Sequence, residues 1–204
     1  MTTGLWGVSI GGKETLTSAD TIPEAEWVLS AGAFDNPLAP QQLTIGFEQG
    51  VPVSLNGEAL SPVELIEKLE VLAGGYGIGR GIHVGDTVLG TKGRVAFEAP
   101  AAEVLLDAHR ELEKITLTAL QSRVKDSLAN TYGDFVHEGK QLDPACRDIE
   151  ALLASSQERV TGEVKLMLRP GNAFVEGVQS PYSLMDATKG VYGEAAGEWT
   201  PQDA

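Results

Sequence analysis

The sequence predicts an α+β fold, with a mainly antiparallel sheet packed against helices, on two observations. Segments with the alternation of strands and segments with the periodicity of helices are mixed along the chain, without the regular strand–helix alternation that builds parallel sheets. Neighbouring strand-like segments are joined by short turns at Gln49-Gly50 and at Pro170-Gly171-Asn172, as in hairpins. The 204 residues, 42% of them hydrophobic, are enough to bury a sizeable core.

The first 42 residues are expected to form an irregular connector, because three prolines interrupt them and no hydrophobic period persists. Residues 43–186 are expected to form the compact domain. It opens with a hairpin over residues 43–56, where apolar and polar residues alternate on either side of Gln49-Gly50. Residues 187–204 are expected to be the start of a C-terminal tail and carry no clear element.

A helix is predicted to begin at Pro62, directly after a capping signal. Ser61 is a typical N-cap residue, and Glu64 completes a capping box three positions later. The helix is expected to end at Gly74-Gly75, which stops the apolar stripe.

The remainder of the chain mixes strand and helix patterns. Short strands are predicted at 82–84, 87–89 and 94–98, and a final strand pair at 160–168 and 173–178. Helices are predicted from Pro100 to Ile115, over 119–132, and after a cap at Asp143-Pro144.

Composition excludes several classes of protein. The 15 Lys and Arg residues against 29 Asp and Glu give a formal net charge of −14, which would repel the phosphates of nucleic acids and of anionic membranes. No run of about 18 apolar residues could span a bilayer, and the N-terminus lacks the pattern of a secretory signal. Cys146 is the single cysteine, so neither an internal disulfide nor a Cys/His metal cluster is expected. We therefore expect an acidic, soluble, cytoplasmic protein.

Two glycine-rich segments come close to nucleotide-binding motifs without matching them. The segment from Gly7 has the glycine spacing of a phosphate loop, but Glu14 stands where a Mg²⁺-binding hydroxyl is required, so a plain glycine loop is expected. Gly75 to Arg80 follows a helix, whereas a dinucleotide fingerprint follows a strand. It is expected to be a helix end and a tight turn, with Arg80 paired either with an anion or with a carboxylate of the chain.

Three further side chains have both a structural and a functional interpretation. His109 lies on the inner edge of its predicted helix, where we expect a hydrogen-bonded core residue rather than a metal ligand. Lys92 and Arg94 flank a glycine turn, and either pair with this acidic chain's own carboxylates or form an anion site. The residues alone provide no nucleophile–base pair, metal set or phosphate loop, and hence no complete catalytic constellation.

Several strings, in a consistent order along the chain, resemble the argininosuccinate synthase family. The strongest match is Gln157-Glu158-Arg159-Val160-Thr161-Gly162, followed by Gly171-Asn172 and Ser180-Pro181-Tyr182-Ser183-Leu184. Others are Phe47-Glu48-Gln49-Gly50-Val51-Pro52-Val53, Leu60-Ser61-Pro62-Val63-Glu64-Leu65, Gly77-Ile78-Gly79-Arg80, Gly90-x-Lys92-x-Arg94-x-x-x-Glu98-x-Pro100 and Ala108-His109. Each string is weak by itself, and their shared order over residues 4–202 carries the resemblance.

The resemblance implies an enzyme of arginine biosynthesis, a ligase that forms a C–N bond. Such enzymes use ATP to join citrulline and aspartate into argininosuccinate, with release of AMP and pyrophosphate. ATP converts the citrulline ureido oxygen, otherwise a poor leaving group, into an adenylate, and the aspartate amine then displaces AMP. Mg²⁺ screens the triphosphate in such chemistry.

The resemblance covers only the C-terminal synthetase and multimerisation part of the family's chain. The family's N-terminal nucleotide-binding domain carries a Ser-Gly-Gly-x-Asp-Ser/Thr phosphate loop, which this sequence lacks. We therefore expect a fragment, or the product of a fragmentary gene, that is inactive alone and has no catalytic, nucleotide-binding or metal-binding residue of its own. The resemblance also implies a homotetramer, whose C-terminal helix is expected to be cut off after residue 204.

The resemblance places part of the citrulline site on four residues. Ser9 matches a family serine that contacts citrulline. The family's citrulline-contacting Glu falls on Gly85, with Asp86 as a neighbouring replacement, and a family Tyr falls on Phe97. These departures are expected to weaken citrulline binding, since each hydrogen bond to a charged group is worth about 1.5–3 kcal/mol. The charged residues of the matching strings are expected to be structural or interfacial: Arg80, Lys92, Arg94 and Glu98.

The alternative interpretation is a non-catalytic oligomerisation or binding module that lacks the ATP-binding half. A phosphate loop encoded in frame upstream of Met1 would favour the enzyme, and its absence would favour the module.

Overall fold

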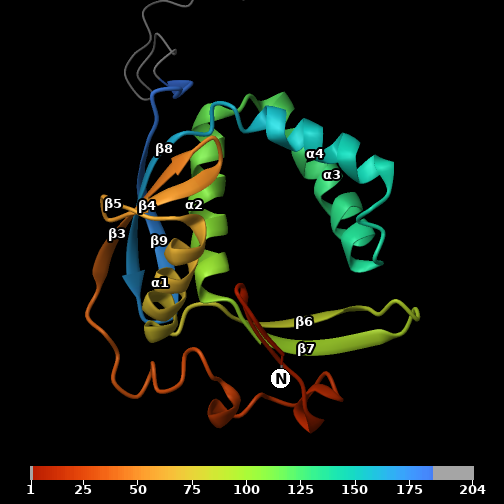
Figure 1. Cartoon of the computed structure of the whole chain (residues 1–204). Helices are drawn as coiled ribbons and strands as arrows, with labels where there is room; N and C mark the ends of the chain where they lie inside the picture. The colour runs from red at the N-terminus through yellow and green to blue at the C-terminus, as the bar shows by residue number, and fades with distance from the viewer. Residues whose placement is uncertain (1, 186–204) are drawn as a thin grey trace, which may run out of the picture.

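The computed structural model describes residues 2–185 and has the α+β architecture that the sequence predicts (Figure 1). The strands are β1 (Thr2–Gly4), β2 (Gly7–Ile10), β3 (Gln41–Glu48), β4 (Val51–Leu55), β5 (Glu58–Ala59), β6 (Arg80–Asp86), β7 (Lys92–Glu98), β8 (Gly162–Arg169) and β9 (Asn172–Gln179). The helices are α1 (Pro62–Gly75), α2 (Pro100–Thr116), α3 (Ala119–His137) and α4 (Pro144–Ser156). Within this described part, no helix combines the length and the apolar character needed to cross a bilayer.

The larger sheet has the strand order β5-β4-β3-β8-β9 and carries the main core. Because side chains alternate along a strand, Leu43 and Ile45 of β3 point to the same face as their partners on β8, Leu166 and Val164, and all four are buried. Helices α1 and α2 pack side by side and cover this face, and their leucines and valines complete the core (Figure 1).

The structure confirms the capping box and the hairpins predicted for the larger sheet and its helices. The predicted capping box at α1 forms, because Ser61 Oγ accepts from the Glu64 N–H at 3.3 Å and Glu64 Oε2 accepts from the Ser61 N–H at 3.0 Å. The hairpin predicted over residues 43–56 is β3–β4, and the predicted final strand pair is β8–β9. Helix α3 extends to His137, beyond its predicted end at residue 132.

The smaller sheet, of order β1-β2-β7-β6, corrects the prediction for the N-terminus. Residues 2–10 are not irregular, because β1 and β2 form a hairpin, and β2 pairs with β7 from Val8↔Glu98 to Ile10↔Ala96. The expected glycine loop is wrong over Gly7–Ile10 for the same reason. Residues 11–40 are irregular as expected, apart from two short 3-10 turns.

Gly7 shows what the first glycine of the near-motif does instead. Its φ is 124°, and a Cβ at this position would lie 2.0 Å from the carbonyl oxygen of Glu98. Only glycine combines that backbone conformation with so close an approach. The residue that suggested a phosphate loop therefore allows β2 to lie against the end of β7.

Strands β6 and β7 form a long hairpin, and its tip corrects a second prediction. Residues 87–89 belong to the turn and not to a strand, and the Thr87 N–H donates to the Thr91 carbonyl at 2.8 Å. Strand β6 is longer than the predicted strand at 82–84, and β7 includes the whole of the predicted strand at 94–98.

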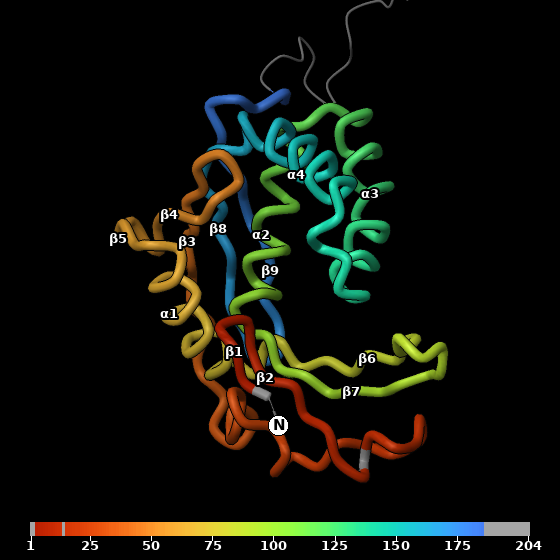
Figure 2. The backbone as a smooth tube through the Cα atoms, turned by 45° about the vertical axis from the view of Figure 1, so that its right-hand side comes forward, coloured from red at the N-terminus to blue at the C-terminus, as the bar shows by residue number. Residues whose placement is uncertain are grey.

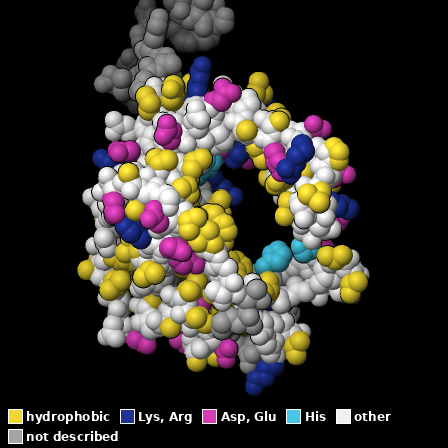
Figure 3. Space-filling model, in the orientation of Figure 1, with side chains coloured by type: hydrophobic (Ala, Val, Ile, Leu, Met, Phe, Trp, Pro, Cys, Tyr) yellow, Lys and Arg dark blue, Asp and Glu magenta, His cyan; other side chains and the backbone are white. Residues whose placement is uncertain are grey.

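One face of the smaller sheet is covered and the other is not. The irregular 11–40 segment lies beneath the sheet and covers one face, as Figures 1 and 2 show from two directions. The second core cluster lies between them: Val8, Ile10, Ala96 and Trp27, with Ile22 and Leu29 packed against it. The opposite face of the sheet is uncovered and faces the opening at the centre of the molecule (Figure 3).

Helices α3 and α4 pack on each other and extend away from both sheets (Figures 1 and 2). None of the described residues of α3 is buried. Figure 3 shows the opening that results, between this helix pair on one side and α2 with the β6–β7 hairpin on the other.

The smaller sheet joins residues 2–10 to residues 80–98, which lie on either side of the boundary predicted at residue 42. The division of the chain into a connector and a domain remains a prediction. The predicted tail, residues 187–204, lies outside the described residues.

Candidate functional site

Ser9 and Phe97 are brought together on the uncovered face of the smaller sheet. They are direct partners in the β2–β7 pairing, and Phe97 is in turn the partner of Gly81 on β6. Directly opposed residues of antiparallel strands project to the same face. Ser9, Phe97 and Gly81 therefore form one row across three strands.

Two glycines of β6 make room for rings on this face. A Cβ at Gly81 would lie 2.3 Å from Phe97 Cζ, and a Cβ at Gly85 would lie 2.4 Å from His83 Nε2. The Phe97 ring therefore lies over Gly81, and the exposed His83 imidazole lies over Gly85. His83 was not singled out from the sequence, because nothing local indicates that its ring would fold back along its own strand.

Asp86 points away from Ser9. Successive residues of a strand project to opposite faces, so Asp86 lies on the face opposite to Gly85. Its carboxylate pairs there with Lys92, at 2.6 Å between Oδ1 and Nζ, and both side chains are largely exposed. The structure thus brings Ser9 and Phe97 together, places Gly85 farther along the same face, and places Asp86 on the other face.

The remaining charged residues of β7 hold the covering segment in place. Arg94 donates to the carbonyl oxygens of Thr17 and Asp20 at 2.5 and 2.7 Å. Glu98 is fully buried and accepts backbone hydrogen bonds from residues 28–30 at 2.6–3.0 Å. Burial acts to raise the pKa of Glu98, but the hydrogen bonds from Ser30 and from these backbone groups outweigh it and lower the pKa.

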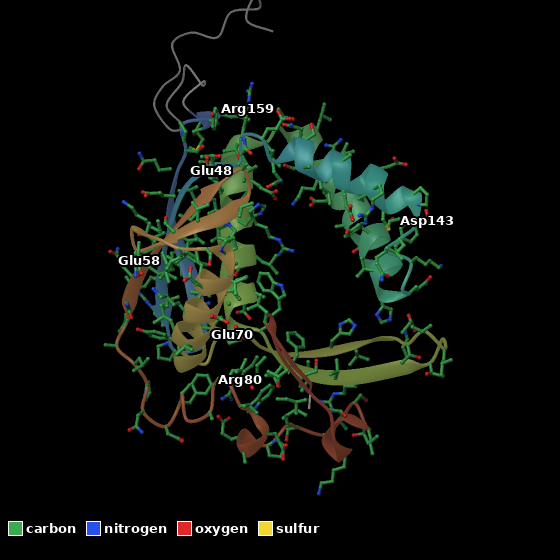
Figure 4. All side chains as sticks on the ribbon, in the orientation of Figure 1. Glu48, Glu58, Glu70, Arg80, Asp143 and Arg159 are labelled. Atoms are coloured by element: carbon green, nitrogen blue, oxygen red, sulfur yellow. The ribbon has the colours of Figure 1, made fainter. Side chains whose placement is uncertain are left out.

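Arg80 pairs with the chain itself, on the same covered side (Figure 4). Its guanidinium makes two 2.7 Å hydrogen bonds to the Glu24 carboxylate and lies 4.9 Å from the ring centroids of both Trp27 and Phe34. The hydrogen bond from Arg80 lowers the pKa of Glu24. Of the two interpretations of Arg80 from the sequence, the structure shows the pairing with a carboxylate.

His109 is hydrogen-bonded, as expected, and belongs to a network that the sequence did not indicate. Its Nε2 lies 2.8 Å from Gln157 Oε1, and Gln157 Nε2 donates to Glu113 at 2.7 Å. Lys125 of α3 donates to the other Glu113 oxygen at 2.8 Å. Burial lowers the pKa of His109, against the opposing effects of the Glu113 charge and the Gln157 hydrogen bond. The network joins α2, α3 and the end of α4, with Gln157 more than 40 residues from its partners on α2.

An apolar groove of about 390 Å³ lies beside this network. It is lined by the β1–β2 turn, the β3–β4 turn and α2, and we call it the Trp6 groove. Its side chains are almost all apolar: Trp6, Phe47, Pro52, Ala102, Leu105, Leu106 and His109, with Gly50. Figure 3 shows hydrophobic side chains gathered on the wall of the opening nearest α2. The sequence did not indicate the groove, because its lining comes from separate segments of the chain.

The described residues include no cluster of potential metal ligands, and Gly7–Ile10 of the near phosphate-loop motif is a strand. Nowhere in residues 2–185 do three or more His, Cys, Asp or Glu side chains gather in a position to hold a metal ion. The segment with phosphate-loop spacing is partly strand, and Lys92 and Arg94 face away from Ser9. The donor sets found here therefore do not fit ATP or Mg²⁺.

Comparisons with known proteins point to one family. The model of the family described as "Arginosuccinate synthase C-terminal domain" matches residues 1–203. The argininosuccinate synthase of Rippkaea orientalis is 42% identical over 171 residues, which are 84% of this chain and 43% of that protein. Those of Methanocaldococcus jannaschii and Symbiobacterium thermophilum are each 41% identical, over 88% and 94% of this chain and 45% and 48% of their own lengths. The chain thus spans less than half the length of these relatives.

Proposed function

The chain belongs to the argininosuccinate synthase family, as its C-terminal domain, and from that premise we propose that it supplies part of the citrulline pocket and an oligomer interface of the ATP-dependent ligase. That ligase would join citrulline and aspartate into argininosuccinate and release AMP and pyrophosphate. The substrates and the reaction belong to the whole enzyme, and this chain contributes one wall of the site.

One observation supports the pocket most directly: Ser9 and Phe97 are paired on the uncovered face of the smaller sheet. The Ser9 hydroxyl can donate to and accept from a ureido or amino-acid group, and the Phe97 ring offers an apolar surface to a methylene chain. Neither Gly85 nor Asp86 presents a carboxylate on that face, because Asp86 is turned away and paired with Lys92. We therefore propose a citrulline contact that is weaker than one containing a carboxylate and a phenol.

ATP and Mg²⁺ would be held by a nucleotide-binding domain outside this chain. The described residues do not fit either group, and we assign them no step that involves the nucleotide. The role of this chain is to position the citrulline ureido group through the Ser9 row.

An AMP-release assay tests the proposal. The chain is incubated with ATP, Mg²⁺, citrulline and aspartate, alone and with the N-terminal part of the Symbiobacterium thermophilum relative. We expect no AMP above the blank from the chain alone and citrulline-dependent AMP from the pair. Ser9→Ala in the pair should raise the KM for citrulline, whereas Val71→Lys, on the exposed side of α1, should not. Citrulline-dependent AMP from the chain alone would contradict the proposal.

We propose in addition that the protein is a homo-oligomer, a tetramer by resemblance to the family. Helices α3 and α4 expose apolar side chains around a hollow of about 520 Å³, among them Leu120, Val124 and Leu152. Apolar hollows on otherwise polar surfaces are typical of interfaces. Sedimentation equilibrium of the wild type and of Leu152→Lys tests this, and a monomer at high concentration would contradict it. The expected cytoplasmic location stays a prediction, which cell fractionation would test.

A second candidate is a non-catalytic binding module, and the lack of polar side chains at Gly85 and Phe97 favours it. It predicts that the chain binds the N-terminal part but that the pair releases no citrulline-dependent AMP. The same assay therefore separates the two candidates.

A further inference from the structure

We propose that His83 is the specificity-determining residue of the proposed citrulline pocket, and that it suits the pocket to a citrulline whose amino group is acylated rather than free. The inference rests on the proposed function in taking citrulline as the parent ligand. It goes beyond that function in naming the side chain of β6 that contacts the ligand and the chemical form of the ligand.

His83 is the one ionisable side chain that β2, β6 and β7 present on the uncovered face. The strand register and the alternation of side chains place seven neutral residues there with it: Gly7, Ser9, Gly81, Gly85, Gly93, Val95 and Phe97. The charged residues of these strands project to the opposite face: Arg80, Asp86, Lys92, Arg94 and Glu98. The uncovered face of these three strands therefore offers no carboxylate that would pair with an ammonium group.

The His83 imidazole lies where a side chain of residue 85 would begin. A Cβ at Gly85 would lie 2.4 Å from His83 Nε2. The His83 side chain is exposed, and no described residue forms a hydrogen bond or an ion pair with it. The position at which the proposed pocket lacks a carboxylate is thus occupied by an imidazole whose nitrogen atoms are available to a ligand.

An imidazole in place of a carboxylate changes which ligand groups this part of the face can hold. A carboxylate only accepts hydrogen bonds, whereas an imidazole offers an N–H donor and brings no negative charge. A free amino group, which is protonated at neutral pH, therefore has no ionic partner on the three strands. The carbonyl of an acylated amino group accepts from the His83 N–H, and Val95, the strand partner of His83, offers an apolar contact to the acyl carbon chain.

The test is a nuclear magnetic resonance titration of this chain with citrulline and with Nα-acetylcitrulline, without ATP so that no turnover occurs. We expect both ligands to shift the His83 ring signals, with the lower Kd for Nα-acetylcitrulline. His83→Ala should raise that Kd about twofold to tenfold, because it removes one hydrogen bond. His83→Gln keeps an N–H donor and should retain most of the affinity.

The matched control is Ile82→Ala. Ile82 is the adjacent residue of the same strand, is exposed, and projects to the opposite face, so its replacement should leave both Kd values unchanged. Circular dichroism and melting temperature establish that each variant is folded. The titrations are repeated with the N-terminal part of the Symbiobacterium thermophilum relative joined ahead of residue 1.

A restored carboxylate should reverse the preference. In the double variant His83→Ala/Gly85→Glu, the ring no longer lies over residue 85, and the new carboxylate can pair with a free amino group. This variant should bind citrulline about tenfold or more tightly than Nα-acetylcitrulline, because hydrogen bonds to charged groups are the stronger ones.

Three results would each overturn the proposal. The first is that neither ligand moves the His83 signals, in the chain alone or in the joined protein. The second is a Kd for Nα-acetylcitrulline that His83→Ala leaves unchanged. The third is wild-type binding of citrulline that is as tight as that of Nα-acetylcitrulline, or tighter. The single variants and the wild type decide these results even where the double variant does not fold.

The outcome is distinguishable from the fate of the proposed function. A preference for Nα-acetylcitrulline that depends on His83, in a joined protein that releases no AMP with either ligand, would support the specificity and contradict the enzymatic role. Citrulline-dependent AMP release that is insensitive to His83→Ala would do the reverse.

Discussion

The buried carboxylate of Glu98 accepts hydrogen bonds from both the backbone N–H and the hydroxyl of Ser30, from a segment 68 residues earlier in the chain. The same hydroxyl accepts from Arg80 Nε at 2.6 Å, and Arg80 is the strand partner of Glu98. These bonds fasten the irregular 11–40 segment beneath the smaller sheet. One face of the sheet is thereby covered, and the Ser9–Phe97 face is the uncovered one.

Glu98→Gln should destabilise the protein by about 1–3 kcal/mol, because an amide cannot replace a carboxylate that accepts from several buried donors. Urea unfolding at neutral pH measures the change. Glu58→Gln is the matched control, since the Glu58–Lys68 pair is largely exposed and is worth at most about 1 kcal/mol. Equal losses for the two variants would show that the Glu98 contacts do not hold the segment.

Gly81 and Gly85, which each lie beneath a ring, should respond differently to substitution by alanine. Gly81→Ala forces a methyl group against the half-buried Phe97 ring and should cost about 1–3 kcal/mol. Gly85→Ala meets only the free end of the exposed His83 side chain, which can turn away, so the cost should be below about 0.5 kcal/mol.

Nuclear magnetic resonance of the His83 ring protons checks the second half of this prediction. Gly85→Ala should shift those signals, because the imidazole leaves the strand, while Gly81→Ala should not. A large loss of stability in Gly85→Ala would mean that His83 is held in place by contacts that it cannot give up.

The sequence predicts most of what is local in this fold and little of what is distant. The capping box at Ser61 and Glu64 acts within one turn, and it correctly located α1. The β2–β7 pairing joins residues about ninety positions apart, and a four-residue strand that begins with glycine carries too little periodicity to predict it. The 87–89 error has a different origin: β-branched residues favour strands, and this local preference does not show where the chain turns.

The candidate site was predictable only through resemblance. Ser9 and Phe97 were singled out separately, and only the sheet register shows that they are neighbours. Alternation along β6 fixes the opposite directions of Gly85 and Asp86, but only once the strand is known to run through both. The His109–Gln157–Glu113 network depends on how α2 and the end of α4 pack, which no local pattern encodes.

His109 should make the protein less stable as the pH falls below its ordinary pKa of about 6.5. Burial lowers the pKa of His109 in the folded chain, so the unfolded chain binds the proton first and gains free energy from it. Stability from this group is therefore complete above pH 6.5 and declines as the pH falls through the lower pKa of the folded state. Urea unfolding at pH 7.5 and 5.5 should show a smaller loss in His109→Gln than in the wild type. An equal loss in both would assign the effect to other groups.

Phe97→Tyr should strengthen citrulline binding in the pair formed with the N-terminal part of a relative. The added hydroxyl would extend from Cζ, which lies over Gly81 of β6, on the face where the proposed pocket has lost a phenol, and one neutral hydrogen bond is worth about 0.5–1.5 kcal/mol. The KM for citrulline should therefore fall about twofold to tenfold, with little change in the KM for ATP. Phe174→Tyr, on the exposed surface of β9, is the matched control and should leave both constants unchanged. If Phe97→Tyr leaves the KM for citrulline unaltered while Ser9→Ala raises it, citrulline contacts Ser9 without reaching the Phe97 ring, and the pocket extends from Ser9 toward β1 rather than along β7.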